Sequence, residues 1–206
     1  MIGIINYGSG NIQAVANIYK RVGITHKIVN TKNDFEEVEK LILPGVGAFD
    51  ATMKVLNNSG LRDDLDYHVL EKQKPVLGIC VGMQIMSNVS EEGCEAGLGW
   101  IKGKVRKFDI SKLQQKPFLP HMGWNTINPI SNSALFQNID NGLGFYFVHS
   151  FYYETEKQES ILAQTQYGEL FTSAINDRHI YGVQFHPEKS HINGITLLTN
   201  FAEIQC

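Results

Sequence analysis

The stretch PVLGICVGMQ, residues 75–84, places one cysteine between two glycines at the end of an apolar run. A nearly continuous apolar strand is typical of a sheet that helices cover on both faces. The pattern Gly-x-Cys-x-Gly, between such a strand and a helix that we expect over residues 83–89, is the context of a nucleophile elbow. From this stretch alone, Cys80 is either a buried core thiol or a displayed nucleophile, because free cysteine also packs as a small hydrophobe.

Strand-like and helix-like segments alternate through the first half of the chain, which predicts a parallel sheet with crossover helices. Aromatic strand-like runs dominate the second half, and we interpret them as antiparallel additions. The sequence therefore predicts an α/β fold, an open and mostly parallel sheet with flanking helices and antiparallel additions, in one domain over residues 1–206. The expected strands are 2–6, 26–29, 41–43, 76–79, 145–153, 161–167, 172–176 and 180–185, and the expected helical segments are 12–22, 34–39, 51–56, 61–70, 83–89 and 195–204.

The charge and hydropathy of the chain exclude several classes of partner. The net charge is −3, and the loose basic group Lys102, Lys104, Arg106 and Lys107 is too sparse to bind a phosphate backbone, so we interpret it as an exposed strand face. No apolar window approaches a membrane-spanning length, and we find no secretory leader pattern. We therefore expect neither a nucleic-acid nor a membrane partner, and a cytoplasmic location.

Cofactor and metal patterns are also missing from the sequence. The three cysteines Cys80, Cys94 and Cys206 include no CxxC pair, and the seven histidines have no HxH or HExxH spacing, so we expect no metal site. Gly8-Ser9-Gly10 starts like a dinucleotide loop, but Gln13 stands where the third glycine is needed. We expect no cofactor, and we interpret Cys94 and Cys206 as incidental.

A second chemical motif, GVQFHPE over residues 182–188, ends the last predicted strand. Residues two apart in an extended backbone project to the same side, and proline biases His186 toward such a backbone, so Glu188 can face the imidazole. A carboxylate there would fix the tautomer of a histidine that takes a proton from a cysteine. Distant residues converge at the carboxyl ends of parallel strands, so we predict a Cys80, His186 and Glu188 triad.

Together, GICVGMQ and GVQFHPE resemble the signature of the class I, triad-type glutamine amidotransferases, which have a flavodoxin-like fold. The resemblance extends over essentially the whole chain and, within the family, is strongest to the glutaminase subunits of imidazole glycerol phosphate synthase and their paralogues. The further matching stretches are NYGSGN at 6–11, LPGVGAFD at 43–50, SEEG at 90–93, PHMGWN at 120–125, YFVHSF at 146–151 and HPEKS at 186–190.

This resemblance also implies binding roles for residues around the triad. Two backbone N–H groups would form an oxyanion hole, one from Val46 or Gly47 and one from Val81, and glycines let such a loop approach a substrate closely. The residues that the resemblance implies for binding glutamine are Gln84, Glu92, His149, Ser150 and Phe151. Glu92 suits the substrate ammonium, and Phe151 stands where the family usually has tyrosine.

The resemblance implies a glutaminase that hydrolyses L-glutamine to glutamate and ammonia. Its partner would be a synthase subunit, a (β/α)₈ barrel that receives the ammonia and makes imidazole glycerol phosphate and AICAR in histidine biosynthesis, docked at the loops 6–11, 120–125 and 186–190. An alternative is a paralogous subunit that supplies ammonia for amidino-sugar formation in surface polysaccharides, which residues 6–24 and 186–195 also resemble. More remote alternatives are a γ-glutamyl hydrolase and a non-enzymatic flavodoxin-like binding module.

Overall fold

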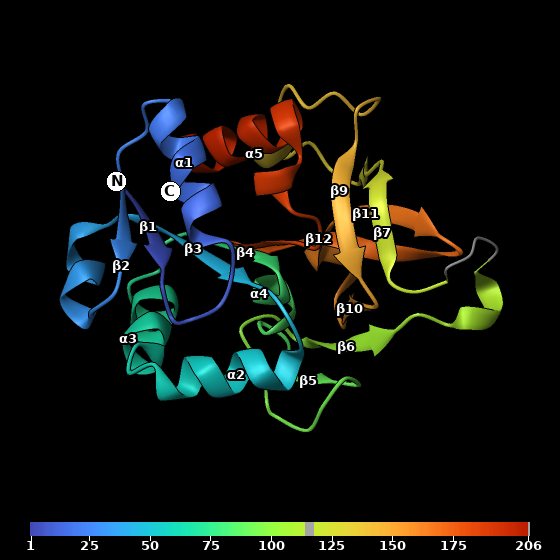
Figure 1. Ribbon diagram of the computed structural model, residues 1–206, viewed down its shortest axis with the longest axis horizontal. Helices are drawn as coiled ribbons and strands as arrows, with labels where there is room; N and C mark the ends of the chain where they lie inside the picture. The colour runs from blue at the N-terminus through green and yellow to red at the C-terminus, as the bar shows by residue number, and fades with distance from the viewer. Residues whose placement is uncertain (114–117, 206) are drawn as a thin grey trace.

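The computed structural model describes residues 1–113 and 118–205, and its strands form one large mixed sheet and a small two-stranded sheet (Figure 1). Five neighbouring strands of the large sheet run parallel, in the order β2-β1-β3-β4-β13. Beyond β13 the sheet continues through antiparallel β12 (Glu169–Asp177), β10 (Phe151–Thr155) and β6 (Gly103–Lys107). The predicted α/β class, a mostly parallel open sheet with antiparallel additions, is confirmed. The parallel strands are β1 (Ile2–Ile5), β2 (His26–Val29), β3 (Lys40–Gly45), β4 (Val76–Cys80) and β13 (Ile180–Val183).

Strands β3, β4 and β13 end at the same edge of the sheet, because they pair side by side in parallel. Gly45 lies opposite Cys80, and Val183 lies opposite Ile79. The strands β3 and β4 are buried along their whole length, as expected where helices cover both faces. The segments that follow these three strands therefore lie together at the carboxyl edge of the sheet. Ligands bind at this edge in open α/β sheets.

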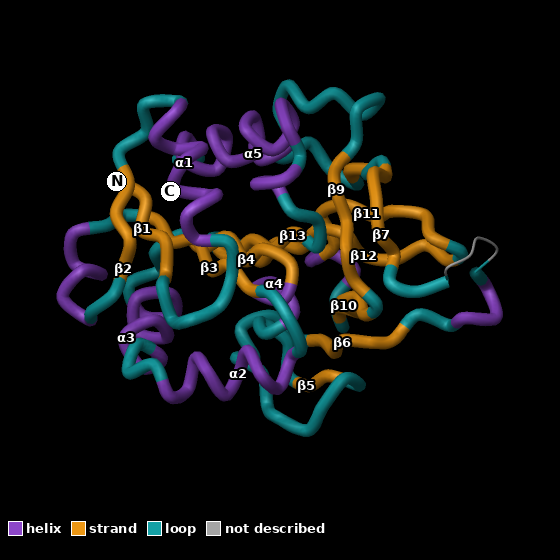
Figure 2. Tube along the Cα trace, in the orientation of Figure 1, coloured by secondary structure: helices purple, strands orange, loops and turns teal. Residues whose placement is uncertain are grey.

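Helices cover the parallel strands on both faces (Figures 1 and 2). On one face lie α1 (Ile12–Arg21) and α5 (His191–Glu203), and on the other lie α2 (Phe49–Asn58) and α3 (Arg62–Asp66), which continues into a π-helical turn (Tyr67–Glu71). Each long helix buries one apolar side, as its amphipathic pattern predicts. The buried apolar side chains of α1, α2 and α5 are Val15, Ala16, Tyr19, Phe49, Met53, Leu56, Leu197, Leu198 and Phe201.

The aromatic half of the chain builds the antiparallel part of the fold. The run predicted as one strand over 145–153 is two strands, β9 (Phe145–His149) and β10 (Phe151–Thr155), which belong to different sheets. Strand β9 pairs with β7 (His121–Asn125), and the chain changes sheets at Ser150. The remaining strands are β5 (Val89–Ser90), β6 (Gly103–Lys107), β8 (Asn128–Pro129), β11 (Ile161–Tyr167) and β12 (Glu169–Asp177).

The helix expected over 83–89 is wrong: α4 is a single turn, Val81–Gln84. The following carbonyl groups accept hydrogen bonds from a distant segment instead of continuing the helix, with Leu98 N–H donating to Ile85 and Ile101 N–H donating to Met86. A local sequence pattern carries no information on such partners. Within residues 1–113 and 118–205, no helix has the length and apolar character needed to cross a membrane.

Candidate active site

Cys80 lies at the strained turn between β4 and α4. Its backbone has φ +55° and ψ −114°, a positive-φ conformation that non-glycine residues rarely adopt. The neighbouring glycines allow the turn because strand and helix approach closely: a Cβ on Gly82 would lie 1.9 Å from the Leu43 carbonyl oxygen, and one on Gly78 would lie 2.7 Å from the Gly82 carbonyl oxygen. This backbone is that of a nucleophile elbow. Strain of this kind is common at functional sites.

His186 and Glu188 lie together just beyond the end of β13. The Nδ1 atom of His186 is 2.8 Å from Oε1 of Glu188, and both side chains are almost completely buried. The expected pairing across Pro187 is present, although Glu188 lies in a short 3-10 turn (Pro187–Lys189) rather than in extended chain. Asn11 Nδ2 donates a second hydrogen bond of 2.8 Å to the same carboxylate oxygen. Sequence reasoning assigned no role to Asn11, which precedes α1.

The three candidate catalytic side chains are coupled electrostatically. Burial alone lowers the pKa of His186, but interactions with Cys80 and Glu188 outweigh it and raise the pKa to about 10. Burial raises the pKa of Glu188, whereas its interactions with His186 and the hydrogen bonds from Asn11 and the backbone together lower it, so the net shift of this pKa is downward. An imidazolium between a carboxylate and a sulfur is therefore favoured at neutral pH. The arrangement therefore places a charged imidazolium, oriented by a carboxylate, beside the candidate nucleophile.

Two buried glutamines connect the nucleophile to the strand that follows Ser150. Gln184, fully buried just after the end of β13, donates from Nε2 to the Cys80 sulfur over 3.7 Å. Its Oε1 accepts a hydrogen bond of 3.0 Å from Gln84, whose Nε2 also donates to the Phe151 carbonyl over 2.9 Å. Both amide protons of Gln84 are thus used inside the protein, which leaves its oxygen for a ligand. Sequence reasoning missed Gln184, although a polar residue within the predicted strand 180–185 was a usable signal.

The loop after β3 holds the residues expected to supply an oxyanion donor. The Val46 N–H donates to the Ser9 hydroxyl over 3.1 Å, and that hydroxyl donates back to the Val46 carbonyl over 3.1 Å. This N–H is therefore bound to Ser9 in the structure. Gly47 has φ +96°, a conformation that favours glycine, and a Cβ there would meet no atom within 4 Å.

A cavity of about 530 Å³ opens over Cys80 and is lined by all of the residues predicted to bind glutamine or to form the oxyanion hole. Glu92 reaches it from the turn after β5 and accepts a 2.8 Å hydrogen bond from the Phe49 N–H through Oε2. Glu188 is the one predicted site residue that does not line the cavity, because it lies behind His186. The lining residues are Asn11, Val46, Gly47, Cys80, Val81, Gln84, Glu92, Pro120, Val148, His149, Ser150, Phe151, His186 and Lys189.

His149 lines the cavity as a neutral, fully hydrogen-bonded side chain. Its Nδ1 bonds the Phe151 carbonyl at 2.8 Å, and its Nε2 bonds Nδ1 of His121 at 3.0 Å. Burial lowers the pKa of His149 to about 3 and that of His121 to about 4. Neither imidazole is therefore a candidate for the catalytic base or for binding a carboxylate by charge.

No group of three or more His, Cys, Asp or Glu side chains in the described ranges is arranged to hold a metal ion. Cys94 is an exposed free thiol, and Cys206 lies outside the described residues.

An elbow cysteine, a buried histidine–carboxylate pair and a cavity over the thiol are the parts of a cysteine-dependent amide hydrolase. The chain belongs to the class I glutamine amidotransferase family, since the family model "Glutamine amidotransferase class-I" matches residues 3–204. Its curated relatives include the imidazole glycerol phosphate synthase subunit HisH of Leptospira borgpetersenii, 46% identical over 204 residues that cover 99% of this chain and 100% of the relative. The protein of the same name from Bdellovibrio bacteriovorus is 49% identical with the same coverage.

The fold has solved counterparts as well. The structure of PurLQS from Thermotoga maritima superposes with a TM-score of 0.71, and the match covers 97% of this chain and 96% of that one. The sequence identity is 16%, so this likeness concerns the fold alone.

Proposed function

We propose that this chain is the glutaminase subunit of an imidazole glycerol phosphate synthase, acting as one domain that hydrolyses L-glutamine and delivers the ammonia for histidine biosynthesis. The observation that carries the catalytic part is the strained Cys80, coupled to the buried His186–Glu188 pair, beneath an open cavity. The full-length similarity to subunits of that synthase supports the biological part.

In the proposed reaction, the Cys80 thiolate attacks the side-chain amide carbon of glutamine, and the carbonyl oxygen becomes an oxyanion. Backbone N–H groups of Val81 and of Val46 or Gly47 stabilise that oxygen. The protonated His186 donates its Nε2 proton to the amide nitrogen, so ammonia leaves and a γ-glutamyl thioester remains. Nε2 is suited to this transfer because Glu188 binds the other ring nitrogen, Nδ1, which leaves Nε2 for the reacting groups beside Cys80.

Water completes the cycle in the reverse sense. The neutral His186 takes a proton from water, the hydroxide attacks the thioester carbonyl, and the Cys80 thiolate leaves as glutamate is released. Glu188 keeps the imidazole in the tautomer that has Nδ1 protonated and stabilises its charged form, and Asn11 holds Glu188 in place.

The polar ends of glutamine match the walls of the cavity. We propose that the Glu92 carboxylate binds the α-ammonium and that the free oxygen of Gln84 and backbone groups of Ser150 and Phe151 bind the remainder. His149 contributes as a neutral support for the Phe151 carbonyl.

A synthase partner of the (β/α)₈-barrel type would dock beside this cavity. An exposed apolar surface supports that location: Trp124, Leu143 and Ile192 border a shallow cavity, and Met122 is exposed on the same strand as Trp124. These side chains come from or adjoin the loops that the sequence predicts for docking. Hydrolysis would then be coupled to the use of ammonia, and we expect low activity without the partner.

The test is glutamate production by the wild-type chain and by Cys80→Ala, each alone and with the barrel subunit and its nucleotide substrate. We expect turnover that needs Cys80 and rises when partner and nucleotide are added. Turnover by folded Cys80→Ala would contradict the catalytic assignment. If only the barrel partner of an amidino-sugar pathway stimulates turnover, the ammonia serves that pathway instead of histidine biosynthesis, and the assignment of glutamine hydrolysis to Cys80 is unchanged.

A further inference from the structure

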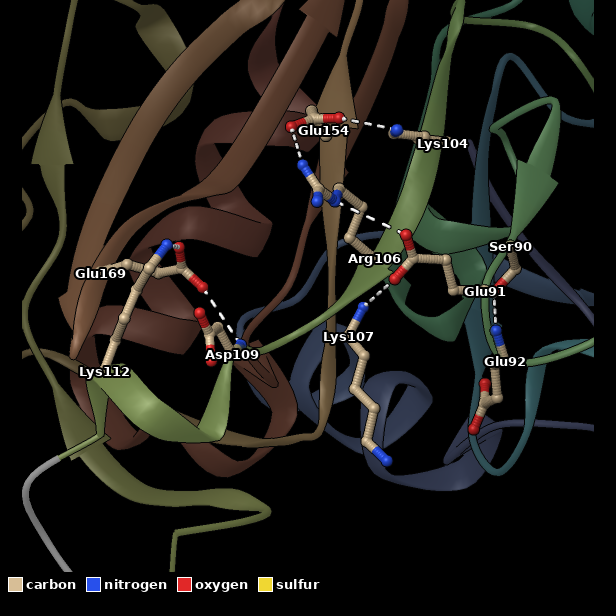
Figure 3. Close-up of polar contacts among 10 residues, drawn as sticks. All are labelled: Ser90, Glu91, Glu92, Lys104, Arg106, Lys107, Asp109, Lys112, Glu154 and Glu169. Carbon is tan, nitrogen blue, oxygen red and sulfur yellow. Dashed lines mark hydrogen bonds and ion pairs between the residues drawn. The ribbon is translucent and has the colours of Figure 1, made fainter.

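Glu92, the proposed ammonium ligand, lies in a tight acidic turn between β5 and residue 95. The Glu92 N–H donates to the Ser90 hydroxyl over 3.0 Å, which folds the start of the turn (Figure 3). One carboxylate oxygen of Glu92 accepts the Phe49 N–H at the N-terminus of α2. The other remains available to the cavity, so the aim of this carboxylate depends on how firmly the turn is held.

On one side the turn is held by the charged face of β6. The Lys107 N–H donates to Oε2 of Glu91 over 2.9 Å, and Arg106 lies 3.6 Å from its other oxygen. Figure 3 shows Arg106 between Glu91 and Glu154. Glu92 is the residue that follows Glu91 in the turn. The basic strand face noted in the sequence therefore anchors the residue before Glu92.

On the other side the turn is held by Asp50, in the first turn of α2. Its two carboxylate oxygens accept the N–H groups of Cys94 and Glu95, each over 3.0 Å. These backbone hydrogen bonds lower the pKa of Asp50, so its carboxylate is charged at neutral pH. We call this pair of hydrogen bonds, from Cys94 and Glu95 to Asp50, the clamp. A Cβ on Gly93 would lie 1.9 Å from an Asp50 oxygen, so the carboxylate packs directly against the residue that follows Glu92.

We propose that Asp50 is a positioning residue for substrate selection: by clamping the turn after Glu92, it aims the Glu92 carboxylate at the α-ammonium of the substrate. This inference rests on the proposed function and deepens it. Phe49 and Asp50 are neighbours on α2, so the first turn of this helix holds both the Glu92 carboxylate, through Phe49, and the backbone after it, through Asp50.

Losing the clamp affects recognition more than chemistry. Gly93 gives the turn a flexible backbone once Asp50 no longer holds Cys94 and Glu95, and Glu92 then spends less time in the productive position. Cys80 and His186 lie at the end of β4 and after β13, which the clamp does not touch. We therefore expect Asp50→Ala to raise KM for glutamine about tenfold with kcat nearly unchanged, the signature of lost uniform binding.

The experiment measures inactivation of Cys80 by a diazoketone analogue of L-glutamine, and by the same diazoketone without its α-amino group. Asp50→Ala should weaken the apparent affinity for the first reagent about tenfold and leave the second unchanged. The matched control is Lys54→Met, which removes an exposed ion pair of 3.8 Å to Glu95 in the same turn but leaves the backbone clamp intact, so it should behave like the wild type. If Asp50→Ala does not fold, Asp50→Asn keeps the shape of the side chain and weakens the clamp. This variant should lose less affinity for the reagent with the α-amino group and none for the reagent without it.

Two outcomes separate the inference from the function on which it rests. If the wild-type chain is not inactivated by the glutamine analogue, the proposed function fails. If it is inactivated, but Asp50→Ala changes the apparent affinity for both reagents by the same factor relative to the wild type, the role of Asp50 is overturned. A second measurement adds the Asp50 change to Glu92→Gln: no further loss supports action through Glu92, whereas an independent loss contradicts it.

Discussion

Removing the Ser9 hydroxyl should raise the glutaminase activity of the isolated chain. The Val46 N–H is bound to that hydroxyl over 3.1 Å, and the hydroxyl in turn donates to the Val46 carbonyl. If Val46 supplies the oxyanion donor, its N–H has to leave Ser9 before it can bind the substrate oxygen. In Ser9→Ala that N–H is free from the start.

The size of the effect follows from the two hydrogen bonds. Each neutral hydrogen bond contributes about 0.5–1.5 kcal/mol net, so breaking the pair costs roughly 1–3 kcal/mol before catalysis. At about 1.4 kcal/mol per tenfold, relief of that cost corresponds to a roughly 5- to 140-fold rise in kcat. The gain cannot exceed the ~10²–10³-fold contribution of one oxyanion donor, because Val46 still has to orient.

The assay is glutamate release by Ser9→Ala without a partner, compared with the wild type. Thr52→Val is the matched control, because its hydroxyl contacts the Val46 carbonyl at 3.5 Å and leaves the N–H bound to Ser9. We expect no rise for Thr52→Val. An unchanged or lower kcat for a correctly folded Ser9→Ala would refute the view that Ser9 withholds this donor.

Three further changes test other parts of the site. Glu188→Gln should lower kcat by about 10²–10⁴-fold. Because loss of the carboxylate lowers the raised pKa of His186, protonated imidazole is lost at a lower pH, and the alkaline limb of the kcat profile should move down in pH; an unmoved limb would count against the pair. Gln184→Leu should slow alkylation of the nucleophile, since its amide no longer stabilises the sulfur, and alkylation rates equal to those of the wild type at several pH values would exclude that role. Gly82→Ala should lower the free energy of unfolding by several kcal/mol, about the upper range for single substitutions, because its Cβ would overlap the Leu43 carbonyl oxygen; a denaturant midpoint like that of the wild type would contradict the close packing.

The fold could be predicted from the sequence because its main features are local. Apolar strands without alternation indicated a sheet covered on both faces, and the glycines at 78 and 82 indicated a tight passage from strand to helix. The helix expected over 83–89 and the single strand expected over 145–153 were wrong because distant contacts decide where these elements end. Hydrogen bonds from residues 98–101 end the helix, and the change of sheet at Ser150 divides the strand.

The same distinction applies to the site. The spacing of His186 and Glu188 predicted their contact, since they are two positions apart in the chain and the proline between them restricts the backbone. Asn11 and Glu188 are 177 positions apart, and Ser9 and Val46 are 37 apart, so only the folded arrangement reveals these contacts. The catalytic and binding roles of these residues stay predictions until they are measured.

The most direct test of Cys80 as the nucleophile is the intact mass of the chain, quenched with acid during glutamine turnover in the presence of its partner. We predict a γ-glutamyl adduct that maps to Cys80, disappears when glutamine is exhausted and is absent from Cys80→Ala. Glutamine turnover without any adduct at Cys80, together with undiminished turnover by Cys80→Ala, would contradict the proposed mechanism.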